Sequence, residues 1–202
     1  MTPSKRPDEV VLRLPQWLRQ FAIDRQVRFD TREARMQFVI DLARRNIEHK
    51  TGGPFGAAVF EAGSGRLLAP GVNLVEPLNC SIAHAEMVAI AMAQQAIGSY
   101  DLGAGGVFCE LVTSTEPCAM CLGAIPWSGV RRVLCGARGE DACAIGFDEG
   151  AKPGDWVGAL RDRGIEVVRD LCRDEARAVL QHYLTAGGRI YNARGEGPGT
   201  GE

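Results

Sequence analysis

Apolar residues in the first third of the chain recur at helical spacing. They form one stripe at i, i+3 and i+4 intervals, as on one face of an amphipathic helix: Met36, Val39, Ile40, Ala43 and Ile47. Asp30, with Glu33 three residues later, predicts that a capping box starts this helix. The run Gly52-Gly53-Pro54 predicts its end.

Shorter apolar runs downstream predict strands that alternate with helices. Residues 55–60 and 67–74 flank the Gly-rich segment 61–66 and predict a hairpin. A hairpin followed by strand–helix alternation predicts an α/β layered fold with a mixed sheet. The later elements are expected as helices over 83–97, from Pro117, over 153–163 and from about Asp174 to Gly187, and as strands over 108–114, 130–137 and 165–168.

The two ends of the chain differ from its middle. Residues 1–30 are expected to form an N-terminal extension, in which Pro3, Pro7 and Pro15 keep regular structure short. Residues 31–194 are expected to form the main domain. The Gly-rich residues 195–202 predict a disordered tail.

Composition narrows the class of protein. The chain has 202 residues, 46% hydrophobic and 24% charged, which suits one globular domain with a real core. Its net charge of -2 gives no basic footprint, so a nucleic-acid partner is not expected. No signal-peptide segment or membrane-spanning run is found. Seven cysteines, an odd number, favour reduced thiols and a cytoplasmic location.

Two short motifs carry the candidate chemistry. His84-Ala85-Glu86 is followed after 30 residues by Pro117-Cys118-Ala119-Met120-Cys121. Both motifs fall at predicted helix starts, where free N–H groups and the positive end of the helix dipole stabilise thiolates. His84, Cys118 and Cys121 therefore make a candidate zinc set. Three protein ligands, rather than four, are typical of a catalytic zinc that leaves one position for water.

Glu86 has a separate part in this interpretation. Two thiolates and a neutral imidazole leave Zn²⁺ with almost no net site charge, so water there is acidified less than at an all-histidine site. A neighbouring carboxylate must then take the proton, and Glu86 is two residues from His84. His-x-Glu with Pro-Cys-x-x-Cys is the signature of zinc deaminases that act on nucleobases and nucleosides.

A closed structural zinc site is the main alternative to a catalytic one. It would need a fourth ligand and would leave Glu86 at the surface. None of the remaining cysteines makes a second Cys-x-x-Cys pair, and each is more typical of a small buried apolar residue: Cys80, Cys109, Cys135, Cys143 and Cys172.

From Gly52 to Asn192 the chain resembles the cytidine deaminase-like superfamily, and within it most closely the bacterial guanine deaminases. The finer resemblance rests on Gly52-Gly53-Pro54-Phe55, Asn73, 114–117, 145–150 and the Tyr191-Asn192 ending. It implies a three-layer α/β/α fold with a mixed five-stranded sheet, one zinc ion per chain and a homodimer.

The resemblance also implies roles for single residues. His84, Cys118 and Cys121 would be the zinc ligands, Glu86 the proton shuttle and Glu149 a second carboxylate for proton transfer. Asn73 would bind the edge of the base and Phe55 would form a wall of the pocket. From residue type alone, Asn73 is a turn residue, and Glu149 forms a solvated loop pair with Asp148.

Four further residues keep open interpretations. Tyr191 and Asn192 either reach a pocket, perhaps a partner chain's, or simply pack. Trp127 is more typical of a core or interface than of a ligand contact. Pro126 departs from the aliphatic residue expected in the family, and it predicts that the second motif's helix bends or ends near residues 122–125.

The leading hypothesis is hydrolysis of guanine to xanthine and ammonia, with other aminopurines or aminotriazines as possible substrates. A tRNA adenosine deaminase, which shares both motifs, is the first alternative, but it should carry a basic RNA-facing surface. A zinc-stabilised binding module without turnover is the second, and it has no use for Glu86 beside an open metal position.

Overall fold

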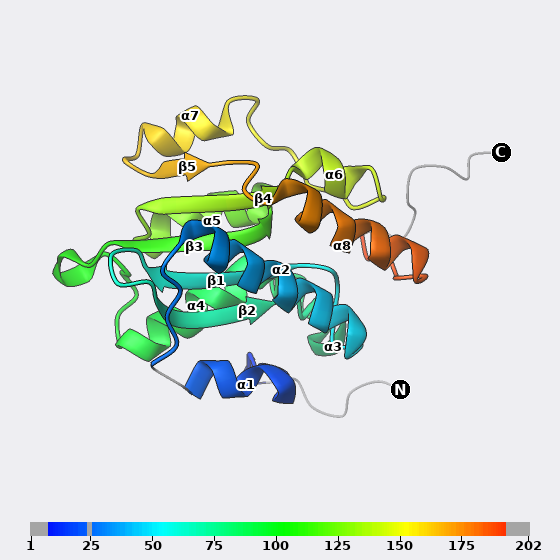
Figure 1. The fold of residues 1–202 in the computed structure, drawn as a ribbon, viewed down its shortest axis with the longest axis horizontal. Coiled ribbons are helices and arrows are strands. Elements are labelled where there is room, and N and C mark those ends of the chain that lie inside the picture. The colour runs from blue at the N-terminus through cyan, green and yellow to red at the C-terminus, as the bar shows by residue number, and fades with distance from the viewer. Residues whose placement is uncertain (1–7, 24–25, 193–202) are drawn as a thin grey trace.

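The protein folds around one mixed five-stranded sheet, whose strands lie side by side across the view of Figure 1. This computed structural model describes residues 8–23 and 26–192. The strand order is β2-β1-β3-β4-β5; β1 is antiparallel to β2 and β3, while β3, β4 and β5 are parallel. The strands are β1 Gly56–Glu61, β2 Arg66–Val72, β3 Cys109–Thr115, β4 Arg132–Ala137 and β5 Glu166–Val168. The predicted hairpin and mixed sheet are confirmed.

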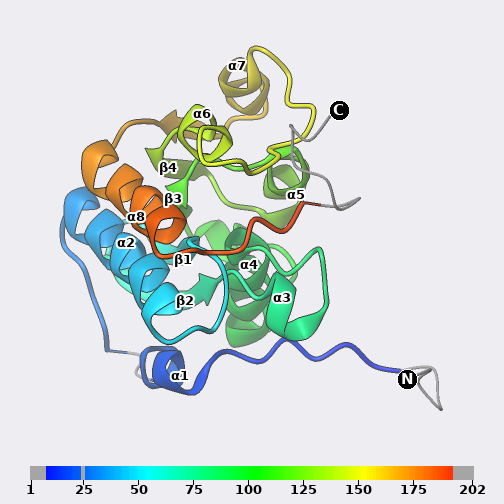
Figure 2. The same cartoon turned by 90° about the vertical axis from the view of Figure 1, so that its right-hand side faces the viewer.

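Helices cover both faces of the sheet, which confirms the three-layer α/β/α prediction (Figure 2). One face is covered by α2 (Arg32–Glu48) and α8 (Arg173–Thr185), and the core there contains Met36, Phe60 and Leu134. The opposite face is covered by α4 (Ala85–Ile97), α5 (Ala119–Ser128) and α7 (Trp156–Arg161). The motif-bearing helices α4 and α5 therefore lie on the same face.

The N-terminal extension packs on the domain through a short helix, α1 (Gln16–Ile23). Leu14 and Leu18 are buried in a cluster with residues of β2 and α4, at the edge of the sheet. Trp17 stacks on His49, with ring centroids 5.2 Å apart. The division of the chain at residue 30 stays a prediction, and the predicted tail 195–202 lies outside the described residues.

Two helix starts differ from the prediction. Helix α2 is capped by Thr31, whose hydroxyl accepts the Ala34 N–H at 3.0 Å, so the capping box on Asp30 and Glu33 is wrong by one residue. Helix α8 begins after Cys172, which has a left-handed backbone (φ 52°), and Asp174 instead lies in its first turn. An acidic residue there still complements the helix dipole.

Pro126 does not end its helix near residues 122–125, so this part of the prediction is wrong: α5 continues to Ser128. Two features stabilise the last turn, a side-chain hydrogen bond and a glycine C-cap. The Ser128 hydroxyl donates to the Ile125 carbonyl at 2.7 Å, and Gly129 ends the helix in the left-handed conformation (φ 83°) that glycine allows.

Three short helices were not predicted: α3 (Val75–Leu78), η1 (Ala104–Gly106) and α6 (Gly139–Cys143). Each has five residues or fewer, too few to show a helical period. Within the described part of the chain, none of the helices combines the length and apolar character that crossing a bilayer requires.

Candidate metal centre and reaction cavity

The starts of α4 and α5 bring the three candidate ligands together. His84 is the N-cap residue of α4, Cys118 is the N-cap of α5, and Cys121 lies in the first turn of α5. Gly71 of β2 allows α4 to approach the sheet, because a Cβ at that position would lie 2.4 Å from the Ala85 carbonyl oxygen. Close packing of α4 on β2 therefore fixes where His84 stands.

The spacing of the ligand atoms fits tetrahedral zinc. Sγ of Cys118 lies 3.5 Å and Sγ of Cys121 lies 3.7 Å from Nδ1 of His84. Zinc bonds of roughly 2.3 Å to sulfur and 2.05 Å to nitrogen, at the tetrahedral angle, would place these atoms about 3.6 Å apart. The donor set and its spacing thus fit a zinc ion held by Nδ1 and the two thiolates.

The ligand group of the described chain has three members, His84, Cys118 and Cys121. The prediction that helix N-termini carry the ligands holds, with a shift of one position. Pro117 precedes α5 rather than being its first residue, and His84 precedes α4. Both N-cap residues have extended backbones. Those extended backbones place the ligands at the end of each helix rather than along its side.

Glu86 lies in the first turn of α4 and is buried, with 6% of its surface exposed. Burial, with the Cys118 charge as a smaller cause, raises the pKa of Glu86 to about 7. A carboxyl group with a pKa in this range can both take and give a proton near neutral pH. The alternative of a purely structural zinc site expected Glu86 at the surface, and the burial of Glu86 shows that this expectation is wrong.

A cavity of about 200 Å³ opens beside the ligands. Three of the predicted site residues, Phe55, Asn73 and Glu149, line it together with His84 and Glu86. Chain segments far apart in sequence thus meet at one small cavity. The cavity also settles the open question on Tyr191 and Asn192, since both line it in the same chain.

Asn73 combines the turn and cavity interpretations. It is buried at the end of β2, and its Oδ1 accepts the Val75 N–H at 3.2 Å, as a turn-forming asparagine does. With Oδ1 occupied in this way, the Nδ2 donor is the part of the amide left to meet a ligand. The side chain is thereby fixed in one orientation before anything binds.

Three buried polar atoms of the cavity wall have no hydrogen-bond partner among the described residues: Thr115 Oγ1, Glu149 Oε2 and Tyr191 Oη. Buried polar groups in proteins are nearly always paired, so these atoms mark where a polar ligand would bind. Burial, followed by the Cys118 charge, raises the pKa of Glu149 to about 8. The residue-type interpretation of a solvated pair is wrong for Glu149 and right for Asp148, which is exposed.

The segment after α8 crosses toward α3 and α5 (Figure 2), and its Tyr191 and Asn192 line the cavity. Asn192 ties it to the loop that carries Glu149: its Oδ1 accepts the Asp148 N–H at 3.0 Å, and its Nδ2 donates to the Gly146 carbonyl at 2.9 Å. The hydroxyl of Tyr191 packs against Gly53, where a Cβ would lie 2.1 Å away. Trp127, by contrast, is 84% exposed and belongs to neither core nor cavity.

Glu116 is a functional candidate that sequence reasoning missed. Although it is only 5% exposed, it lines the cavity, accepts the Gly139 N–H at 3.1 Å and pairs with Arg169 at 2.6 Å. Its place between β3 and Cys118 was a usable signal. A carboxylate one residue from a motif proline, at the end of a buried strand, must find a cation elsewhere in the chain.

Comparison with known proteins gives the same picture. Residues 30–137 match the family described as the cytidine and deoxycytidylate deaminase zinc-binding region. A solved guanine deaminase from Nitrosomonas europaea is 48% identical, with a TM-score of 0.85 over 90% of this chain and 99% of that one. The guanine deaminase of Bacillus subtilis is 39% identical over 117 residues, 58% of this chain and 71% of its own. The tRNA-specific adenosine deaminase of the same organism is 38% identical over 145 residues, 69% and 81% of the two chains.

Proposed function

Because the chain belongs to the cytidine and deoxycytidylate deaminase zinc-binding family, we propose that it is a guanine deaminase, which converts guanine and water to xanthine and ammonia. The observation that carries this proposal is the pairing of a three-ligand metal centre with a buried carboxylate, Glu86, at one small cavity. A structural zinc site needs no such carboxylate and no cavity.

His84, Cys118 and Cys121 would hold the zinc ion, which supplies Lewis-acid activation of water. Glu86 takes a proton from the attacking water and delivers it to the ring nitrogen next to the amino-bearing carbon. The remaining proton of that water is then transferred to the exocyclic amine, and the carbon–nitrogen bond breaks, so that the carbonyl of xanthine forms and ammonia departs. Glu149, another carboxyl group of the cavity wall, serves proton transfer at this amine.

Binding of the base would use the cavity wall. Phe55 offers an aromatic face, and it packs edge-on against Phe147 with ring centroids 4.9 Å apart. The Nδ2 donor of Asn73 would meet an acceptor on the edge of the base. The unpaired hydroxyls of Thr115 and Tyr191 can each donate or accept a hydrogen bond. A polar, planar purine base provides such groups around its whole edge.

Two observations favour a free base over a tRNA. Two arginines of the outer helices already have acidic partners: Arg45 lies 2.7 Å from Asp41, and Arg173 lies 3.0 Å from Asp141. Cations paired in this way offer little to phosphates, whose contacts dominate RNA affinity. The segment that carries Tyr191 also covers one side of the cavity, which suits a small ligand.

A substrate panel tests the proposal directly. Zinc-loaded protein is incubated with guanine, adenine, cytosine, an aminotriazine and an unmodified tRNA, and ammonia and the deaminated products are quantified. Guanine should give equal amounts of xanthine and ammonia, and the tRNA should give no inosine. Inosine in the tRNA without xanthine from guanine would favour the adenosine deaminase. No product from any of them would favour the binding module.

Two further expectations belong with this proposal. A homodimer is supported by the exposed Trp127 on α5, since large exposed aromatic side chains are enriched at interfaces. A cytoplasmic location is supported by seven cysteines that all carry free thiols in the structure. Sedimentation analysis of the wild type and of Trp127→Lys tests the dimer, which the substitution should weaken.

A further inference from the structure

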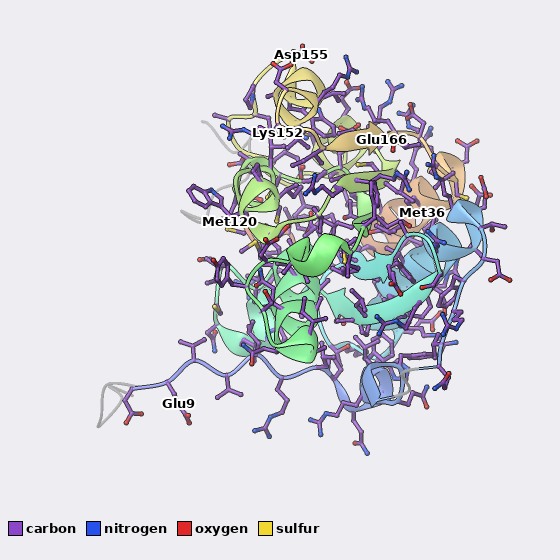
Figure 3. The ribbon with its side chains drawn as sticks, turned by 90° about the vertical axis from the view of Figure 1, so that its left-hand side faces the viewer. Glu9, Met36, Met120, Lys152, Asp155 and Glu166 are labelled. Atoms are coloured by element: carbon purple, nitrogen blue, oxygen red, sulfur yellow. The ribbon has the colours of Figure 1, made fainter. Side chains whose placement is uncertain are left out.

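Lys152 lies on the loop before α7, beside the start of α5 (Figure 3). Its side chain is 15% exposed, and its Nζ is directed at three groups. It donates to the Pro117 carbonyl at 3.1 Å, and it lies 3.8 Å from Glu116 Oε2 and 3.9 Å from Glu149 Oε2. One ammonium group thus links the residue before ligand Cys118 to two carboxylates of the cavity wall, Glu116 and Glu149.

Glu149 depends on Lys152 for a counter-charge more than Glu116 does. Glu116 has a closer cation, because Arg169 Nε lies 2.6 Å from its Oε1, and it also accepts the Gly139 N–H. No such partner is found for Glu149: Oε2 has no hydrogen bond in the described structure, and Lys152 is the cation paired with it. Removal of the ammonium would therefore leave Glu149 without this counter-charge, whereas Glu116 would keep Arg169.

The distance of 3.9 Å between Lys152 Nζ and Glu149 Oε2 indicates an ion pair without a hydrogen bond. It is short enough for an ion pair but too long for a hydrogen bond. In its ionised form Glu149 is therefore held by charge, while Oε2 keeps its hydrogen-bonding capacity for a ligand. Two neighbours fix the ammonium: the Trp156 ring at 5.4 Å and Gly139, where an added Cβ would lie 2.8 Å from Nζ.

We propose that Lys152 is a positioning residue for deamination, holding the Glu149 carboxylate in place in the cavity wall through its ammonium group. This inference rests on the proposed function, in which Glu149 serves proton transfer at the departing amine. A residue that acts only by placing a proton carrier should affect turnover far more than it affects binding of the base.

The test compares steady-state deamination of guanine by zinc-loaded wild type, Lys152→Met, Lys152→Arg and Gly139→Ala. Lys152→Met should lower kcat by about 10- to 100-fold, the scale expected for a misplaced catalytic group, with KM changed less than about threefold. Lys152→Arg should restore most of kcat. Gly139→Ala leaves the charge in the chain but displaces Nζ, so it should lower kcat in the same direction.

Lys50→Met is the matched control, since it removes the same charge from an exposed lysine. It should leave kcat unchanged, and zinc content and melting temperature should stay close to wild type in the Lys152 variants. Wild-type kcat in Lys152→Met would overturn the inference alone, as would a loss of zinc or of folding in Lys152→Met that accounts for its lower activity. A wild type that releases no ammonia from guanine would overturn the proposed function, and this inference with it.

Discussion

A buried ion network connects the sheet to the helix layer, and its disruption gives a quantitative prediction. Glu110 of β3 is fully buried and accepts from Arg35 of α2 and, at 3.0 Å, from Arg132 of β4. Arg35 is only 4% exposed and also donates to the Phe29 carbonyl at 2.9 Å.

The substitution Glu110→Gln keeps the shape of the side chain and removes its charge. Arg35 is then left as a buried cation without a counter-charge, and breaking a buried pair in this way costs about 3–5 kcal/mol. We expect the free energy of unfolding to fall by about 3 kcal/mol, at the low end of this range, because Arg132 retains Glu166 as a partner at 2.7 Å. For a chain of this size that corresponds to a melting temperature lower by about 6–12 °C.

The assay is urea unfolding, with calorimetry, at a fixed excess of zinc, because a bound metal adds to apparent stability. Glu61→Gln is the matched control: Glu61 pairs with Arg66 at 3.2 Å near the surface, where such pairs are worth about 0.5 kcal/mol. Equal losses of stability in the two variants would refute the reasoning that the Glu110 network depends on burial.

Two further predictions concern packing and pH. Gly71→Ala places a Cβ 2.4 Å from the Ala85 carbonyl oxygen and 2.5 Å from the Ala89 nitrogen, so α4 should move outward. We expect the free energy of unfolding to fall by about 1–3 kcal/mol and zinc to bind more weakly in a competition with a chelator. Unchanged zinc affinity would show that the spacing between α4 and the sheet does not matter for the metal centre. The Arg173 guanidinium holds the pKa of Asp141 below its usual value, so this pair stabilises the fold above the unfolded pKa of about 3.9 and is lost as pH falls through the lowered folded pKa. Melting temperature should therefore fall less between pH 7 and pH 3 in Asp141→Asn than in wild type, and equal slopes would contradict this.

The sheet was predictable because its strands are short apolar runs bounded by glycine or charged residues. Helix starts were less so. Thr31 follows Asp30 directly, and both are good N-cap residues, so only backbone geometry decides between them. The same holds for Pro117 and Cys118: the motif fixes the ligand spacing but not which residue is the first to adopt helical dihedrals.

Some residues of the site could likewise be predicted from the sequence and others could not. His84, Glu86 and the cysteine pair stand within compact motifs, so local sequence was enough to select them. Glu149 follows Cys121 by 28 residues, and only the family resemblance pointed to it. Lys152 was missed altogether, because its contacts depend on how the loop before α7 folds back onto the start of α5.

The central claim is a zinc centre open to water with Glu86 as its proton carrier. Zinc content per chain and ammonia release from guanine, measured side by side for wild type and Glu86→Gln, test it most directly. The account predicts about one zinc ion in each protein and a turnover lower by about 10²- to 10⁴-fold in the variant, as expected when a general base is removed. Full activity in Glu86→Gln, or a wild type that holds no zinc, would contradict it.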